Sequence, residues 1–214
     1  MDVILDKDTD DKTYKQFYEE EVHKLIDLIK DPNNIRGLLY MHKWILKHTN
    51  KDDKVLDVGC GHGVLCNLLK KEERYPYGID ISSVGVAFCQ DKVKDVEFVQ
   101  GKAEELPFED NYFDVVASNQ MIEHLSTPEI AIKEMIRVCK NGGKLLITTP
   151  IGDSMGAVGV HGHLHNFDLY NIMSLFDQFG DDYKIYYLNK FNQYNQNNQL
   201  NPKNIFGIIY NVHK

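Results

Sequence analysis

Two spacings of hydrophobic residues divide the chain. Between residues 13 and 48, apolar side chains recur every three or four positions, which predicts two helices over 13–30 and 36–48. From residue 54 onward, short apolar runs alternate with amphipathic segments. The runs predict seven strands, over 54–58, 77–80, 96–99, 113–117, 144–148, 183–188 and 205–212. The segments between them predict helices over 64–69, 83–92, 128–139 and 168–179. Such alternation indicates an α/β protein with a doubly wound, mostly parallel sheet.

The same pattern suggests how the chain is organised. We expect residues 1–50 to form an N-terminal helical cap segment and residues 51–214 to form the core, within a single domain overall. The helix predicted over 128–139 should end because Asn141-Gly142-Gly143 follows it as a stop signal. Residues 151–166 are predicted to be irregular, and the Asn- and Gln-rich stretch over 189–204 to be a loose connection between the last two strands.

Composition narrows the class of protein. The formal net charge is −8, which argues against duplex nucleic acid as a partner. The chain has no apolar run of the length that a membrane-spanning helix needs, and its first residues are acidic where a signal peptide would be basic. We therefore expect no membrane span and a cytoplasmic location. The four cysteines include no CxxC pair, which favours reduced thiols over a structural zinc site.

Three glycines follow the first strand of the predicted sheet. Gly59, Gly61 and Gly63 occupy alternate positions just after Asp57. Glycine is the residue that accepts positive φ angles and lets a ligand come close to bare backbone. In an open α/β sheet, ligands bind beyond the carboxyl ends of the strands, where this loop falls. The loop is a candidate ligand site, and a packing turn is the alternative explanation of the glycines alone.

An acidic residue at the end of the next strand favours a ligand. Asp80 follows the glycine loop at the distance from which an acid accepts two hydrogen bonds from a ribose diol. The third glycine of the dinucleotide-binding pattern is missing, and Asp57 would repel a pyrophosphate. A nucleoside that carries an ammonium group and no phosphate fits these demands. S-adenosylmethionine is such a compound.

Six successive motifs resemble one known family. They are VLDVGCGHG (55–63), YGID (77–80), GKAEELPF (101–108), FDVVA (113–117), IEHL (122–125) and GGKLLITTP (142–150). In order and spacing they resemble the class I S-adenosylmethionine-dependent methyltransferases over residues 52–180, and within them the subgroup that includes ubiquinone-pathway O-methyltransferases and many small-molecule enzymes. The resemblance implies a seven-stranded Rossmann-like fold and S-adenosyl-L-methionine as the cofactor.

The resemblance also implies a role for each matching position. Asp57 and the glycine loop would hold the methionine end of the cofactor, Asp80 would bind the ribose hydroxyls, Ile81 would lie against the adenine, Ala103 and Glu104 would border the adenine, and Asn119 would place its backbone near the sulfonium. One position departs from the family. Many relatives have an aspartate at the place of Lys102, and a charged lysine cannot accept a hydrogen bond from the adenine amino group.

Histidines supply the candidate catalytic groups. Methyl transfer from a sulfonium is an in-line displacement in which the protein mainly aligns the reacting atoms. A hydroxyl acceptor must also lose a proton, and histidine is the usual base near neutral pH. His124 follows the fourth strand, and His163 and His165 lie in the loop after the fifth, so all three belong to the carboxyl edge of the sheet. Packing or solvated side chains are the alternative explanation of these histidines.

A metal-dependent variant of this site stays open as an alternative. Some relatives carry ExxEH after the fourth strand and a later histidine, and they bind a divalent ion; they include RNA 3′-terminal methyltransferases. Here Gln120 replaces the first acid of that pattern, ahead of Glu123 and His124, with His163 or His165 as the later histidine. Because an amide oxygen is a weaker ligand than a carboxylate for a hard cation, our prediction contains no metal.

The sequence thus predicts an enzyme that transfers a methyl group from S-adenosylmethionine to a small molecule, at a hydroxyl oxygen, with histidine as the base. The alternatives are metal-assisted methylation of an RNA 3′ end and a noncatalytic S-adenosylmethionine-binding regulator. A homodimer through the exposed helices is compatible with the sequence, although nothing in it requires one.

Overall fold

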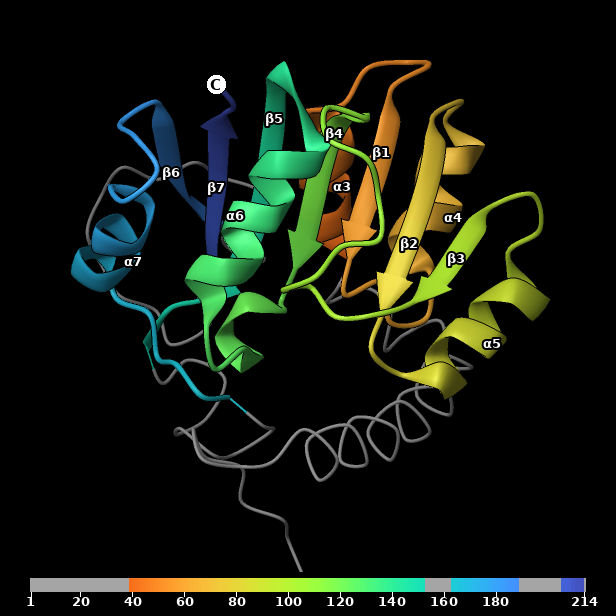
Figure 1. Cartoon of the computed structure of the whole chain (residues 1–214), viewed down its shortest axis with the longest axis horizontal. Helices are drawn as coiled ribbons and strands as arrows, with labels where there is room; N and C mark the ends of the chain where they lie inside the picture. Colours follow the sequence, from red (N-terminus) through yellow and green to blue (C-terminus); the bar gives the residue numbers. More distant parts are fainter. Residues whose placement is uncertain (1–38, 153–162, 189–204, 214) are drawn as a thin grey trace, which may run out of the picture.

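One seven-stranded sheet forms the centre of the molecule (Figure 1). The computed structural model describes residues 39–152, 163–188 and 205–213. Its strands are β1 (Lys54–Val58), β2 (Tyr75–Asp80), β3 (Glu97–Gln100), β4 (Phe113–Asn119), β5 (Cys139–Pro150), β6 (Tyr183–Leu188) and β7 (Ile205–Asn211). The strand order is β3-β2-β1-β4-β5-β7-β6. Strands β1 to β5 run parallel, and β7 is antiparallel to both neighbours. The predicted doubly wound, mostly parallel sheet is confirmed.

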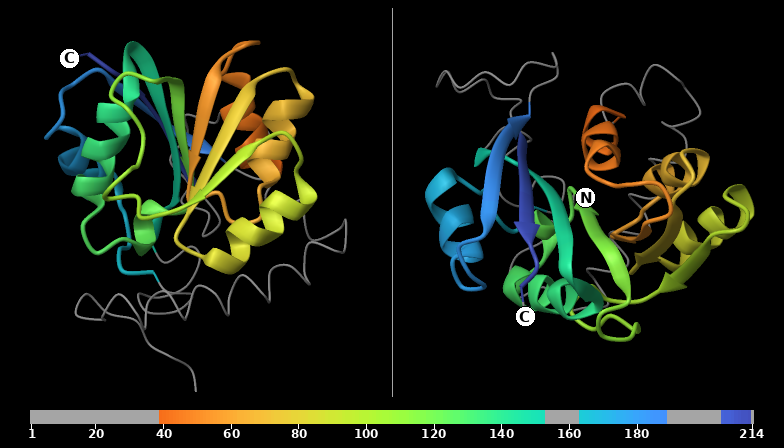
Figure 2. Two further views of the ribbon diagram at one scale, coloured as in Figure 1. Left: turned by 45° about the vertical axis from the view of Figure 1, so that its right-hand side comes forward. Right: turned by 90° about the horizontal axis from the view of Figure 1, so that it is seen from above.

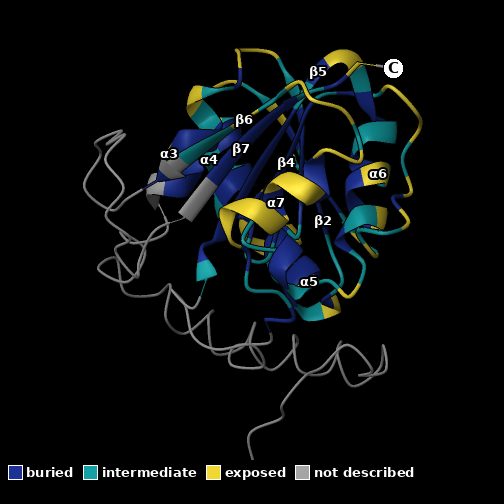
Figure 3. Ribbon diagram, turned by 90° about the vertical axis from the view of Figure 1, so that its left-hand side faces the viewer, coloured by how far each residue is buried: buried dark blue, intermediate teal, exposed yellow. Residues whose placement is uncertain are grey.

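Helices cover both faces of the sheet (Figure 2). They are α3 (Leu39–Lys47), α4 (Val64–Lys71), α5 (Ser83–Lys92), α6 (Pro128–Val138) and α7 (Leu169–Phe176), with a 3-10 turn, η1 (Ile122–His124), after β4. Neighbouring residues of a strand face opposite sides, so Val55 joins the core under α3 and α4 while Leu56 joins the core under α6 and α7. Figure 3 shows the strands buried between these layers and exposed positions on the outer sides of α6 and α7.

The clearest difference from prediction lies between α6 and β5. The helix ends at Val138, and β5 begins at the next residue, so the Asn141-Gly142-Gly143 sequence lies inside a long strand with a register shift rather than at a helix end. Cys139 already pairs with Phe113 in the sheet. A side chain at position 143 would lie 2.7 Å from the Asp114 carbonyl oxygen. The glycine is therefore required by the close approach of β4 rather than by a helix stop.

Other predicted elements agree with the structure within a few residues. Ser82 caps the start of α5, and its Oγ accepts a hydrogen bond from the Gly85 amide at 3.0 Å. Helix α7 ends three residues earlier than predicted, at Phe176. The predictions of a helix over 13–30 and of a connection over 189–204 lie outside the described residues. Within the described ranges, every helix is too short or too polar to cross a membrane.

Candidate functional site

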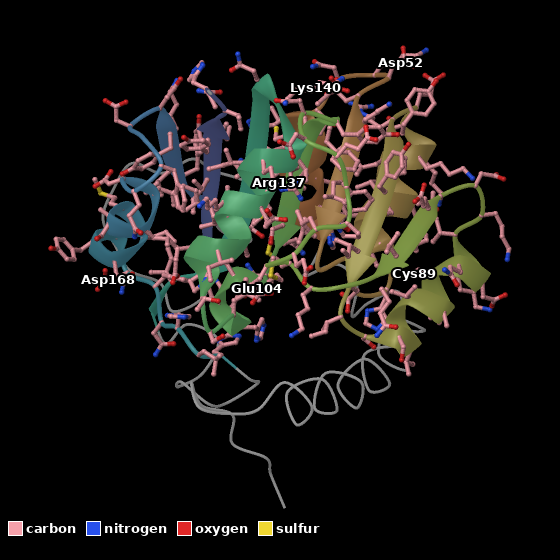
Figure 4. All side chains as sticks on the ribbon, viewed as in Figure 1. Asp52, Cys89, Glu104, Arg137, Lys140 and Asp168 are labelled. Atoms are coloured by element: carbon pink, nitrogen blue, oxygen red, sulfur yellow. The ribbon has the colours of Figure 1, made fainter. Side chains whose placement is uncertain are left out.

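The site is built at the carboxyl edge of β1, β2 and β4. The sheet order reverses between β1 and β4, which makes this edge the switch point where ligands bind in folds of this kind. Figure 4 shows Glu104 at this edge, at the carboxyl ends of the parallel strands, whereas Asp52 and Lys140 lie at the opposite edge. The predicted cofactor residues therefore come together at one edge of the sheet.

The glycine loop between β1 and α4 has a backbone that suits glycine. Gly59, Gly61 and Gly63 have φ angles of 76°, 50° and 68°, all in the left-handed region. A Cβ at Gly59 would lie 2.7 Å from the Met121 side chain, so that position is closed by packing. Among the described residues beyond its two chain neighbours, none would have an atom within 4 Å of a Cβ at Gly61. The loop is thus held from one side and has open space on the other, at Gly61.

Asp80 joins the end of β2 to the glycine loop. Its Oδ2 accepts a hydrogen bond from the Gly61 amide at 2.8 Å, and its Oδ1 accepts one from the Ser82 amide at 2.9 Å. Burial raises the pKa of this carboxyl group, and the two amides act in the opposite direction. Because each carboxylate oxygen has a second lone pair, Asp80 can hold the loop and still accept hydrogen bonds from a diol.

Asp57, near the end of β1, is buried with little polar contact. Its carboxyl group is 2% exposed, and the Cys66 thiol donates a long hydrogen bond of 3.7 Å to its Oδ2. Burial, with a smaller contribution from the charge of Asp80, raises the pKa of Asp57 from 3.8 to about 7 against the lowering effect of the Cys66 hydrogen bond. A bound cation next to Asp57 would favour the ionised form, so the site suits a ligand with a positive charge.

The loop after β3 is fastened to α6. Arg137 donates hydrogen bonds to the carbonyl oxygens of Leu106 and Phe108 at 2.8 and 2.9 Å, and it forms an ion pair with Glu134 at 2.7 Å. Glu134 in turn accepts a hydrogen bond from the Leu106 amide at 2.9 Å. The predicted adenine-binding residues precede this anchored segment, so their backbone is held from behind.

The residues of that adenine-binding segment differ in exposure. Ala103 and Glu104 are half-buried, as is Ile81 after β2, whereas Lys102 is exposed. The position that departs from the family pattern is therefore exposed, whereas the predicted adenine-binding positions are half-buried.

The end of β4 carries a short chain of side-chain hydrogen bonds. The Thr148 hydroxyl donates to Asn119 Oδ1 at 2.6 Å, and Asn119 Nδ2 faces His42 Nε2 at 3.1 Å. Gln120 Nε2 donates to the Thr148 hydroxyl at 3.4 Å. Gln120 itself has a φ of 55°, which is rare outside glycine. Asn119 is thus tied to α3 and to β5 by its side chain.

Glu123 lies at the centre of the candidate catalytic group. It is fully buried, its Oε2 accepts a hydrogen bond from the Thr149 hydroxyl at 3.1 Å, and its Oε1 has no hydrogen-bond partner among the described residues. Burial raises the pKa of Glu123 to about 8. The rings of His124 and His163 pack edge to face, with their centroids 4.8 Å apart. Glu123, His124 and His163 each offer one atom that could bind a metal, and these three atoms lie within 4.8 Å of one another.

His165 occupies a different position from His124 and His163. Its Nε2 lies 2.9 Å from the Leu125 carbonyl oxygen, and its ring stacks on Phe167 with centroids 5.4 Å apart. The backbone amides of Leu164 and His165 both donate to the Glu123 carbonyl oxygen, which draws the loop after β5 onto η1. The structure therefore groups His124 with His163 and places His165 beside them as part of the loop's own packing.

The sequence did not point to two of these residues. His42 lies on α3, 77 positions from its partner Asn119, and no local pattern links them. Arg137 looks like any basic residue in the last turn of a helix. Gln120 stands out in the sequence only because it replaces the first acid of the metal-binding pattern. A signal for His42 did exist, since it shares an otherwise apolar helical stripe with Met41 and Ile45.

The chain matches known proteins over this same region. The family described as "Methyltransferase domain" matches residues 56–147. A fatty-acid O-methyltransferase of Mycolicibacterium smegmatis is 32% identical over 147 residues, which are 66% of this chain and 54% of that protein. An ajmaline N-methyltransferase of Rauvolfia serpentina is 37% identical over 108 residues, 47% of this chain and 37% of that protein. The chain thus spans about half or less of the length of these relatives.

A solved structure supports the fold. The crystal structure of an S-adenosylmethionine-dependent methyltransferase from Aquifex aeolicus superposes with a TM-score of 0.68 at 21% identity, over 91% of this chain and 98% of that one. At this level of identity the likeness concerns the fold, and it agrees with the sheet order described above.

Proposed function

We infer that the chain is an S-adenosylmethionine-dependent methyltransferase, because residues 56–147 match the methyltransferase domain family and the relatives named above are methyltransferases. On that premise we propose that it transfers a methyl group to a hydroxyl oxygen of a small-molecule acceptor. The observation that carries the proposal is the position of Glu123, His124 and His163 at the same sheet edge as the glycine loop and Asp80. We expect the domain to work in the cytoplasm. The division into a cap of residues 1–50 and a core of 51–214 stays a prediction, as does a homodimer.

The described residues fit the cofactor. The open space at Gly61 gives room for a ligand against bare backbone, and Asp80 next to it retains the lone pairs that ribose hydroxyls need. Asp57 is a buried acid with a single weak thiol contact, which suits the ammonium of the methionine end. When bound, the cofactor supplies an activated methyl group on a sulfonium. The chain then has to place an acceptor in line with it and exclude water.

His124 is the residue that we assign as the base. It is half-buried at the end of η1, and Glu123 Oε1 lies 4.0 Å from its Nε2. A hydroxyl proton taken up by His124 would turn the ring into a cation beside Glu123, and the ionised form of that carboxyl group would stabilise the charged ring. Because burial raises the pKa of Glu123 to about 8, this support is greatest at alkaline pH. The edge-to-face contact with His163 limits rotation of the His124 ring. The relatives named above include O- and N-methyltransferases, so the choice of oxygen rests on the presence of a base.

Cofactor binding is the first test. Titration calorimetry with S-adenosylmethionine should show binding to the wild-type protein and a large loss of affinity for Asp80→Ala. Asp91→Ala, which removes an exposed acid from the far end of α5, is the matched control and should bind like the wild type. Equal affinities of the Asp80→Ala variant and the wild type would remove the ribose assignment.

Turnover tests the role of His124. On a panel of phenols, sugars, hydroxy acids and short RNAs, we expect methylation of a small hydroxyl compound. His124→Gln should lower kcat by about 10²–10⁴, the usual contribution of a general base, with little change in KM. His213→Gln, which alters an exposed ring that pairs with Asp182, is the control. A His124→Gln variant with wild-type kcat at neutral pH would refute the assignment.

A metal-assisted reaction is the second candidate, and the cluster of Glu123, His124 and His163 favours it. Bonds of about 2.1 Å at a tetrahedral metal separate ligand atoms by ~3.4 Å, whereas His124 Nε2 and Glu123 Oε1 are 4.0 Å apart. This pair would therefore have to close by roughly half an ångström around an ion, and the group as a whole, whose ligand atoms lie within 4.8 Å of one another, by up to about 1.4 Å. Loss of turnover with a chelator, restored by Zn²⁺ or Mn²⁺, would favour this candidate, and RNA in the acceptor panel would identify its substrate.

A further inference from the structure

Hydrogen bonds link four side chains at the end of β4, and the donor and acceptor of each bond can be assigned; the four belong to Gln120, Thr148, Asn119 and His42. The Thr148 hydroxyl gives its proton to Asn119 Oδ1 at 2.6 Å, so the other amide atom, Nδ2, must donate to His42 Nε2. His42 then carries its proton on Nδ1. Burial lowers the pKa of His42 to about 4, which keeps the ring neutral. At the other end, Gln120 donates through Nε2 to Thr148, which leaves its carbonyl oxygen for another partner.

Both ends of this series are unsatisfied. His42 Nδ1 and Gln120 Oε1 are buried and have no hydrogen-bond partner among the described residues. His42 as a whole is only 6% exposed. Buried polar atoms of native proteins are nearly always hydrogen-bonded. The two ends also differ in kind: Gln120 offers an acceptor, and His42 offers a donor.

Gln120 lies next to the glycine loop. The following residue, Met121, contacts Gly59 so closely that a Cβ there would be 2.7 Å away. The left-handed backbone of Gln120 and the hydrogen bond from its amide to the Thr148 carbonyl oxygen, at 2.9 Å, fix the turn that puts it there. Gln120 directly follows β4, the neighbour of β1 in the sheet, and therefore belongs to the same sheet edge as the loop at which the methionine end of the cofactor would bind.

We propose that Gln120 Oε1 accepts a hydrogen bond from the acceptor molecule, and that His42 acts as a positioning residue by holding the Gln120 amide through Asn119 and Thr148. The acceptor then carries an O–H or N–H donor at this point, as an alcohol, phenol or amine does. A carboxylate is disfavoured because it would place an anionic oxygen against a carbonyl oxygen with no proton between them. The inference rests on the proposed function, since it takes Gln120 to face the acceptor.

Matched ligands test the substrate class. The probes are octan-1-ol, octylamine and octanoate, together with 4-methylphenol and 4-methylbenzoate, titrated into the full chain saturated with S-adenosylhomocysteine. The wild type should bind the donor-bearing member of each series about tenfold or more tightly than the carboxylate. In Gln120→Met, which keeps the length of the side chain and removes its polar atoms, this ratio should fall to near one. Gln120→Glu, which keeps an acceptor, should restore the preference for the amine.

The positioning role of His42 has its own measurements. Nitrogen NMR of the His42 ring should show a neutral ring with its proton on Nδ1 between pH 5 and 8. Thr148→Val, which removes the hydroxyl at nearly constant volume, should reduce the preference for donor-bearing ligands by about half or more while the affinity for S-adenosylhomocysteine stays unchanged. A purely structural role of Thr148 would not alter a ratio between two ligands.

Several outcomes would overturn the inference. They are a carboxylate that binds as tightly as the matched alcohol or phenol, a preference that survives Gln120→Met, a His42 proton on Nε2, or no binding of any alcohol, phenol or amine. Weaker Mn²⁺ binding by Gln120→Met than by the wild type would make Gln120 a metal ligand instead and would also overturn it. Failure of the wild type to bind S-adenosylhomocysteine would refute the proposed function itself, which separates the two failures.

Discussion

Replacing Asp57 with asparagine should make the domain more stable, and the gain should depend strongly on pH. Asp57 is 2% exposed, and burial raises its pKa from 3.8 to about 7. Below pH 3.8 this group is protonated in both the folded and the unfolded chain. As the pH rises from 3.8 to 7, the unfolded chain loses the proton and the folded chain keeps it, so stability falls over this range.

The size of the effect follows from the shift in pKa. Each pH unit between the two pKa values costs about 1.4 kcal/mol, so by pH 8 the free energy of unfolding of the wild type has lost about 4 kcal/mol, against about 1.6 kcal/mol at pH 5. Asparagine does not titrate and can keep the contact with Cys66. Asp57→Asn should therefore gain about 3 kcal/mol more at pH 8 than at pH 5.

Urea denaturation of both proteins at pH 5 and pH 8, in the absence of cofactor, measures this difference. The cost of burying an asparagine amide is the same at both pH values, and the other buried acids are common to both proteins, so these contributions cancel. A difference between variant and wild type that is the same at pH 5 and pH 8 would show that Asp57 is ionised in the folded state at both, and the reasoning would fail.

Three further predictions follow from the described contacts. Gly59→Ala should lower the free energy of unfolding by about 1–3 kcal/mol, because the new Cβ would clash with Met121 at a position whose φ is already strained. Gly61→Ala should lower the free energy of unfolding by about 1 kcal/mol and mainly weaken cofactor binding. Urea denaturation measures the first effect and calorimetry the second. Arg137→Met, which frees the loop after β3, should weaken cofactor binding about tenfold or more with unchanged pH dependence, as measured by calorimetry. Glu123→Gln should raise stability in thermal denaturation more at pH 9 than at pH 5. Burial raises the pKa of Glu123 to about 8, so the wild type loses stability as the pH rises to that value and the unfolded chain alone ionises. An equal change in stability at both pH values would contradict this prediction.

The sheet could be predicted because each strand carries its own signal. Both β1 and β6 are predicted from short runs that are mostly apolar. The start of β5 was missed, because Asn141 and the two glycines after it read locally as a helix stop, whereas Gly143 lets β5 approach Asp114. Such a contact between strands leaves no trace in local spacing.

The site was predicted to the extent that its residues belong to one motif. The glycine loop and Asp80 follow strands at recognisable distances, and the structure joins them by a hydrogen bond from Gly61. The partnership of His42 with Asn119 was out of reach, because it depends on how α3 crosses β4. Burial was equally invisible in advance: nothing in the sequence around Glu123 distinguishes a fully buried acid from a solvated one.

The exposed segment of Asn141 and Gly142 in β5 has a practical use. Beyond its two chain neighbours, no described residue would have an atom within 4 Å of a Cβ at Gly142, and the neighbouring Lys140 lies at the amino edge of the sheet, across its full height from Glu104 (Figure 4). A peptide tag inserted between Asn141 and Gly142 would attach the protein to a sensor chip with the glycine loop directed away from the support, so that surface-based measurements of ligand binding would not be hindered by the immobilisation.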